Sequence, residues 1–100
     1  MTTYRERFNK RFNQEKHESN SRAKITKLSG IPKKILDEVY SRGVGAFKTT
    51  GPSRPNMTKE QWGNARTLAF VMKSYKARED GTDTINQDKD LYMKIKNKLK

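Results

Sequence analysis

The stretch that decides the fold runs from Asp37 to Phe70 and reads DEVYSRGVGAFKTTGPSRPNMTKEQWGNARTLAF. It holds the single tryptophan of the chain, Trp62, together with four of the six glycines and two of the three prolines. An amphipathic segment lies at each end of the stretch, and a Gly- and Pro-rich segment lies between them. This pattern predicts two helices that form a corner around a connection.

The first helix of the corner is expected over residues 31–42. Pro32 suits the first turn, where its missing N–H would have no partner anyway. The apolar residues at helical spacing are Ile35, Leu36, Val39 and Tyr40. Gly43 is expected to end the helix in a left-handed conformation, and Gly45 to let the chain turn closely. We therefore predict an irregular connection over 43–57.

The second helix of the corner is expected over residues 58–78. Thr58 and Gln61 have the spacing of a capping box, in which each side chain bonds the backbone N–H of the other residue. An apolar face follows, and it begins at Trp62. We interpret Trp62 as a core anchor that covers Tyr40, because a single tryptophan on an alanine-rich helix is typical of a small core. Stacking on a nucleic-acid base is the alternative.

Charged residues on the two helices are expected to hold the corner together. Arg42 or Arg66 would pair with Asp37 or Glu38, which lie in the first half of the first helix. A phosphate contact by Arg66 is the alternative.

The rest of the chain predicts an all-α fold with two parts. Residues 1–28 are expected to form a basic arm and linker, with a helix over 3–17, and 29–100 a small helical domain closed by a helix over 88–99. On the arm, Tyr4, Phe8 and Phe12 recur every four residues and form an aromatic stripe. The surface that orders this stripe is either the protein's own core or a partner. Residues 18–30 have the composition of a linker.

Motifs for catalysis or cofactor binding are absent from the sequence. A Walker-type phosphate loop needs glycine directly before its lysine, but Phe47 precedes Lys48. The chain has no cysteine, and its one histidine, His17, has no neighbouring metal ligand. We therefore expect a protein that is not an enzyme and has no metal, cofactor or small-molecule substrate.

The net charge of +12, from 23 Lys and Arg against 11 Asp and Glu, favours a polyanionic partner. The candidate contacts to phosphates or an acidic surface are Arg5, Arg7, Lys10, Arg11, Lys33, Lys34, Lys48, Arg54, Lys94, Lys96 and Lys98.

No apolar run approaches the roughly 20 residues that cross a bilayer, and the charged N-terminus does not have the pattern of a secretory signal. We expect neither a membrane span nor secretion.

Five short segments together resemble a known family. They are Gly30-Ile31-Pro32, DEVYSRGVGA at 37–46, Arg54-Pro55, QWGNAR at 61–66 and Lys89-Asp90-Leu91, and the single residue Phe70 between the last two also belongs to the pattern. The pattern resembles an uncharacterised domain in proteins of large algal DNA viruses and tailed phages, over about residues 29–92. The resemblance implies a viral or phage origin and a compact helical domain. It supplies no catalytic residues and leaves the arm outside.

Two functions follow as expectations. The first is a structural component of a virus particle, such as a minor capsid, cement or internal protein, whose aromatic stripe docks on a capsid or other virion protein. The alternative is a protein that binds DNA or RNA through phosphates without reading the sequence. Either role places the protein in the virion or inside the infected host cell.

Overall fold

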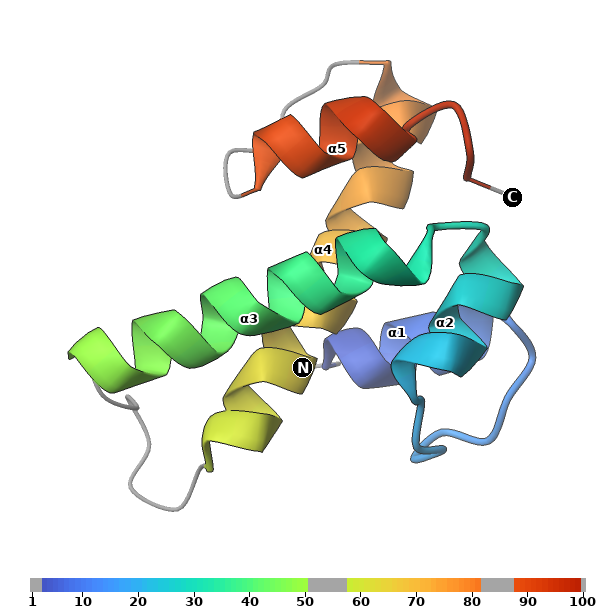
Figure 1. The fold of residues 1–100 in the computed structure, drawn as a ribbon. Helices are drawn as coiled ribbons and strands as arrows, with labels where there is room; N and C mark the ends of the chain where they lie inside the picture. Colours follow the sequence, from blue (N-terminus) through green and yellow to red (C-terminus); the bar gives the residue numbers. More distant parts are fainter. Residues whose placement is uncertain (1–2, 51–57, 82–87, 100) are drawn as a thin grey trace.

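The described part of the chain contains five α-helices, which follow one another in sequence (Figure 1). The computed structural model describes residues 3–50, 58–81 and 88–99, with the side chains of all but 47–50. The helices are α1 (Tyr4–Arg11), α2 (Arg22–Ser29), α3 (Lys33–Thr50), α4 (Lys59–Asp80) and α5 (Lys89–Ile95). No strand occurs in the described ranges, so the predicted all-α fold is confirmed.

The longest helix, α4, begins and ends where the sequence signals place it. The Thr58 hydroxyl accepts a hydrogen bond from the Gln61 N–H (3.1 Å), and the Gln61 side chain accepts one from the Thr58 N–H (2.9 Å). This is the predicted capping box. At the other end, Gly81 adopts a left-handed conformation (φ 66°) that ends the helix.

By contrast, α3 continues through Gly43 and Gly45 to Thr50, so the predicted helix end at Gly43 is wrong. Figure 1 shows that α3 crosses α4, and Gly43 of α3 lies against Gly63 and Arg66 of α4. A Cβ atom on Gly43 would lie 3.1 Å from the Cα atom of Gly63, and one on Gly63 would lie 2.8 Å from the Tyr40 ring. Glycine therefore serves a close helix–helix contact at this point. That contact outweighs the roughly 1 kcal/mol that glycine costs inside a helix.

Trp62 is half-buried and does not belong to the core cluster, contrary to its predicted role as core anchor. The contact with Tyr40 is made one residue further on, at Gly63. The absence of a side chain, and not an aromatic ring, therefore sets the helix spacing at this contact.

Residues 18–30 contain a helix, α2, where a linker was predicted. The Ser21 hydroxyl caps α2 by accepting a hydrogen bond from the Lys24 N–H (3.1 Å). Gly30 ends it in a left-handed conformation (φ 82°). Ile25 and Ser29 face the interior and are at most 2% exposed. The helix is short and mostly polar, which explains why its sequence reads as a linker.

The N-terminal helix packs on the rest of the protein. It ends at Arg11, earlier than the predicted helix over 3–17. Phe8 is completely buried in the core, and Phe12 contacts both Phe8 and Tyr75, with ring centroids 4.8 and 6.1 Å away. Tyr4 is half-buried against the same core. Of the two surfaces left open by the sequence, the protein's own core therefore covers Phe8 completely and Tyr4 and Phe12 in part. The stripe as a whole is not free to dock on a partner protein.

A buried asparagine organises the connection between α1 and α2. Asn9 is fully buried, and its amide donates hydrogen bonds to the carbonyl oxygens of Lys16 (3.0 Å) and Glu18 (3.1 Å). Its own carbonyl oxygen accepts hydrogen bonds from Gln14 (3.0 Å) and Asn20 (2.8 Å). Because a buried polar group is stable only with its partners in place, this network holds the connection in one conformation.

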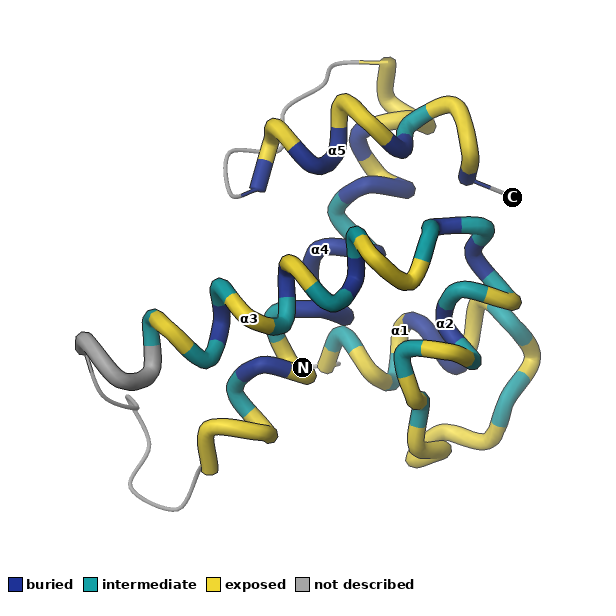
Figure 2. The backbone as a smooth tube through the Cα atoms, viewed as in Figure 1, coloured by how far each residue is buried: buried dark blue, intermediate teal, exposed yellow. Residues whose placement is uncertain are grey.

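The core gathers around α4. Figure 2 shows buried residues along the middle of this helix. The largest fully buried side chains include Tyr75, Tyr92, Phe8, Ile25, Ile31 and Leu36. α5 contributes Leu91 and Ile95, and the chain beyond it contributes Leu99. Regular helix ends at Ile95, within the predicted helix over 88–99.

Two glycine substitutions test the close crossing. Gly63→Ala places a methyl group against the Tyr40 ring and should lower the free energy of unfolding by about 1–3 kcal/mol. Gly45→Ala is the matched control, because its Cβ meets nothing within 4 Å. It should raise the free energy of unfolding by about 0.5–1 kcal/mol through helix propensity. Urea denaturation followed by circular dichroism measures both, and equal stabilisation by the two substitutions would contradict the close crossing.

Candidate functional site

The helix crossing positions two arginines on one buried carboxylate. Asp88 precedes α5, and its side chain is 2% exposed. Arg66 of α4 donates to both carboxylate oxygens, from Nη2 to Oδ1 (2.9 Å) and from Nε to Oδ2 (3.1 Å). Arg42 of α3 donates from Nη1 to Oδ1 (3.1 Å). Asp88 therefore joins three helices through charged hydrogen bonds, which are stronger than neutral ones.

Arg42 makes further ion pairs at the surface. Its two terminal nitrogens each donate to Asp90 at 2.9 Å, and its Nε donates to Glu38 at 3.2 Å. The hydrogen bonds to Asp90 and Asp88 raise the pKa of Arg42, and the bond from Arg42 lowers the pKa of Asp90 from 3.8 to about 2. Arg42 is therefore engaged in holding α5 against α3.

The predicted arginine–carboxylate pairs are right in one part and wrong in another. Arg42 does pair with Glu38, one turn away on the same helix. Arg66 pairs with Asp88 and not with Asp37 or Glu38. Asp88 was missed, because an aspartate at the start of a helix is explained by the helix dipole alone. Only the tertiary structure brings it to the two arginines.

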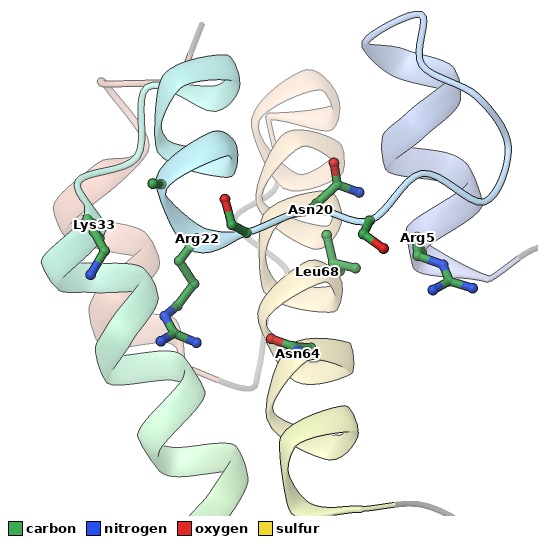
Figure 3. Close-up of a pocket in the computed structure, with 9 residues that line it drawn as sticks. Arg5, Asn20, Arg22, Lys33, Asn64 and Leu68 are labelled. Atoms are coloured by element: carbon green, nitrogen blue, oxygen red, sulfur yellow. The ribbon is translucent and has the colours of Figure 1, made fainter.

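A second group of cations surrounds an open hollow of about 540 Å³, called here the basic hollow. Its labelled lining residues in Figure 3 are Arg5, Asn20, Arg22, Lys33, Asn64 and Leu68. Figure 3 shows α1 on one side of the hollow and α2 and α3 on the other. Asn64 and Leu68 of α4 lie between the two sides.

Arg22 is held in a fixed position beside the hollow. Its Nε donates to Asp37 Oδ1 (2.7 Å), and its guanidinium lies 4.1 Å from the centre of the Tyr40 ring. Lys33 donates to the other oxygen of Asp37 (3.1 Å). Burial alone would raise the pKa of Asp37, but the hydrogen bonds from Lys33 and Arg22 outweigh it and lower the pKa. Arg5, Arg22 and Lys33 line the hollow, and Asp37 beside it pairs with Arg22 and Lys33. The hollow therefore keeps a positive charge.

The polar side chains of the hollow come from the ordered connection and from α4. Asn20 is held by the Asn9 network, since it donates to Asn9 Oδ1 and accepts from Gln14 (2.9 Å). Asn64 is exposed on α4. Asn20 already donates to Asn9 and Glu18, so Asn64 is the amide donor beside the cations, and a donor of this kind suits an anion with several oxygen atoms. The described residues that line the hollow include no acid–base pair.

The predicted phosphate contacts divide between different surfaces. Arg5 and Lys33 line the basic hollow, while Arg7 and Arg11 lie on the opposite flank of α1. Five lysines line neither of these surfaces: Lys10 on α1, Lys34 on α3, Lys94 on α5 and Lys98 after it are exposed, and Lys96 after α5 is half-buried. Lys48 and Arg54 lie outside the described side chains. The sequence interpretation missed Arg22, Asn20 and Asn64, because their grouping depends on α2 and its connection.

Other site chemistry is not found in the described ranges. No group of three or more His, Cys, Asp or Glu side chains there is arranged to hold a metal ion. Nor does any described helix combine the length and the apolar character needed to cross a membrane.

Asp88→Asn tests the buried ion pairs. The substitution keeps the shape of the side chain but removes the charge that both arginines share. It should lower the free energy of unfolding by about 2–3 kcal/mol, less than for a fully buried pair because Arg42 is partly solvated. Asp90→Asn is the control and should cost much less, because Asp90 is exposed. Equal losses in urea denaturation would contradict the central place of Asp88.

The lowered pKa of Asp90 predicts a pH dependence. A carboxylate with a lowered pKa in the folded state stabilises the fold above its unfolded pKa and loses this effect as the pH falls through its folded pKa. The stability difference between wild type and Asp90→Asn should therefore be constant above about pH 5 and vanish as the pH approaches about 2. Denaturation at a series of pH values measures it, and a difference that persists at the lowest pH would rule out the Arg42–Asp90 pair as its cause.

Comparison with known proteins gives a family but no activity. No curated protein and no solved structure matches the chain significantly. A family model matches residues 1–92, which include α1 and α2. The match therefore includes the segment that the sequence resemblance left outside as an arm. The chain belongs to the family of unknown function DUF5824.

Proposed function

We propose that this protein is a non-enzymatic protein that binds DNA or RNA through phosphates, without reading the sequence. The observation that carries the proposal is the basic hollow, where Arg5, Arg22 and Lys33 from three helices face one open surface. The net charge of +12 adds long-range attraction for a polyanion. Association with the genome of a virus or phage, in the particle or in the infected cell, is part of the proposal and rests on the sequence resemblance.

The chemistry of the hollow fits a phosphate better than a neutral ligand. Arginine presents a planar fork of donors that matches phosphate oxygens. The Arg22 guanidinium is already oriented by Asp37 and Tyr40, so it loses little freedom when an anion arrives. Asn64, which is exposed on α4, adds a neutral donor. The hollow is open along one face, as a chain-like ligand requires.

The other role expected from the sequence, docking on a capsid protein, lacks the contact on which it was based. The aromatic stripe packs on α4 in the protein's own core, and Phe8 has no exposed surface. A particle component of this family would use a different surface. Binding to the packaged genome is compatible with the basic hollow.

Fluorescence anisotropy with a labelled oligonucleotide of mixed sequence, at several salt concentrations, tests the proposal. The double variant Arg5→Gln/Lys33→Gln removes two cations from the hollow. It should weaken binding and reduce the slope of log K against log salt by about 1.4–1.8, since each phosphate contact contributes about 0.7–0.9. A change of base sequence should leave the affinity nearly unaltered.

The matched control is Lys89→Gln/Lys94→Gln on α5, which makes the same change in net charge. In the view of Figure 1, α3 separates α5 from α1 and α2. This control should change the affinity and slope much less. Equal effects of the two double variants would exclude the hollow as the site, and no binding by the wild type at low salt would refute the function.

A further inference from the structure

A second hollow, of about 340 Å³, lies on the other flank of α1 and differs from the first in its chemistry. Its lining includes Tyr4, Arg7, Arg11, Lys73, Lys76 and Glu79, and it is called here the aromatic hollow. α1 and the C-terminal half of α4 form its walls. It combines four cations with an aromatic ring at the surface.

Tyr4 is the ring that faces this hollow in an accessible position. It is half-buried, and two cations flank it at loose distances, with the Arg7 guanidinium 5.4 Å and the Lys73 ammonium 5.8 Å from the ring centre. Tyr75, which also borders the hollow, is 2% exposed and has the Arg11 guanidinium 3.9 Å from its ring centre. The cations over the Tyr4 ring thus lie farther from it than Arg11 lies from Tyr75, and Tyr4 is the less buried of the two rings, so Tyr4 is the ring of this hollow that a flat partner can reach.

The two hollows lie on either side of the start of α1. Tyr4 and Arg5 are adjacent in sequence, yet Arg5 lines the basic hollow and Tyr4 the aromatic hollow. Successive residues of a helix point about 100° apart, so one turn of α1 presents a cation to one side and an aromatic ring to the other. Arg7 and Lys73 continue the positive charge beyond Tyr4. The negative group of this hollow, Glu79, is paired with Arg11 at 2.7 Å.

We infer that the protein prefers single-stranded to double-stranded nucleic acid, with an unpaired base stacked on Tyr4 and the neighbouring phosphates on Arg5 and on Arg7 or Lys73. This inference rests on the proposed function and specifies its substrate. Stacking on an aromatic ring accepts any base, because every base has a flat face. In a duplex the bases already stack on each other and cannot reach Tyr4, so a duplex keeps the phosphate contacts alone.

The experiment compares a single-stranded oligonucleotide with the duplex of the same sequence and with a single strand that contains abasic sites. The wild type should bind the normal single strand about tenfold more tightly than the abasic strand, the range expected for one stacked base. It should also bind it more tightly than the duplex. Abasic sites leave the phosphates in place, so this comparison isolates the contribution of the bases.

Variants at Tyr4 identify the ring that carries the stacking. Tyr4→Leu keeps apolar contact with the core but removes the aromatic face. It should weaken binding of the single strand about tenfold and leave duplex and abasic binding unchanged. Tyr4→Phe keeps the ring and should behave as the wild type. Circular dichroism melts of both variants establish that they are folded.

Two results would overturn the inference, and they differ in what they say about the proposed function. Equal affinity of the wild type for all three ligands, with no selective effect of Tyr4→Leu, would show phosphate binding without base stacking. The proposed function would then stand, but the single-strand preference would be wrong. Absence of binding to every ligand at low salt would overturn both.

Discussion

The close crossing of α3 and α4 at Gly43 and Gly63 determines how the remaining elements are placed. Because neither residue has a side chain, the two helices approach closely: a Cβ atom on Gly63 would collide with the Tyr40 ring, and one on Gly43 would lie only 3.1 Å from the Gly63 Cα atom. Arg42 and Arg66 flank this crossing on the two helices, and the short separation lets both reach Asp88. Asp88 in turn fixes the start of α5. A larger interhelical distance would separate the arginines and leave a buried carboxylate without its partners, which is costly.

This arrangement separates the arginines into two groups with different tasks. Arg42 and Arg66 are bound to carboxylates at the crossing and hold helices together. Arg5 and Arg22 lie at the rim of an open hollow, and even there Arg22 has its orientation set by Asp37 and Tyr40. The net charge of the chain therefore overstates the number of cations that can meet a ligand. Their position, and not their number, indicates where a polyanion would bind.

The fold was predictable from sequence where local signals decide the structure, as in α4. The capping box of Thr58 and Gln61 depends on residues three apart, and it forms as predicted. Gly43 shows the opposite case. The same residue can end a helix or permit a close contact, and only the position of α4 decides between the two. For α1, the apolar spacing predicted a stripe around Phe8 but not the surface that covers it.

The candidate site was predictable in part for the same reason. Arg5 and Lys33 were recognised as basic residues on expected helices. Arg22 and Asn20 belong to a polar segment whose shape depends on Asn9, which is buried by contacts that no local pattern reveals.

The separation between structural and ligand-binding arginines can be measured directly by NMR, by following the side-chain Nε–H resonances during titration with a short single-stranded oligonucleotide. The structure predicts that the resonances of Arg5 and Arg22 shift while those of Arg42 and Arg66 stay in place. Shifts centred on Arg42 and Arg66, with Arg5 and Arg22 unaffected, would contradict it.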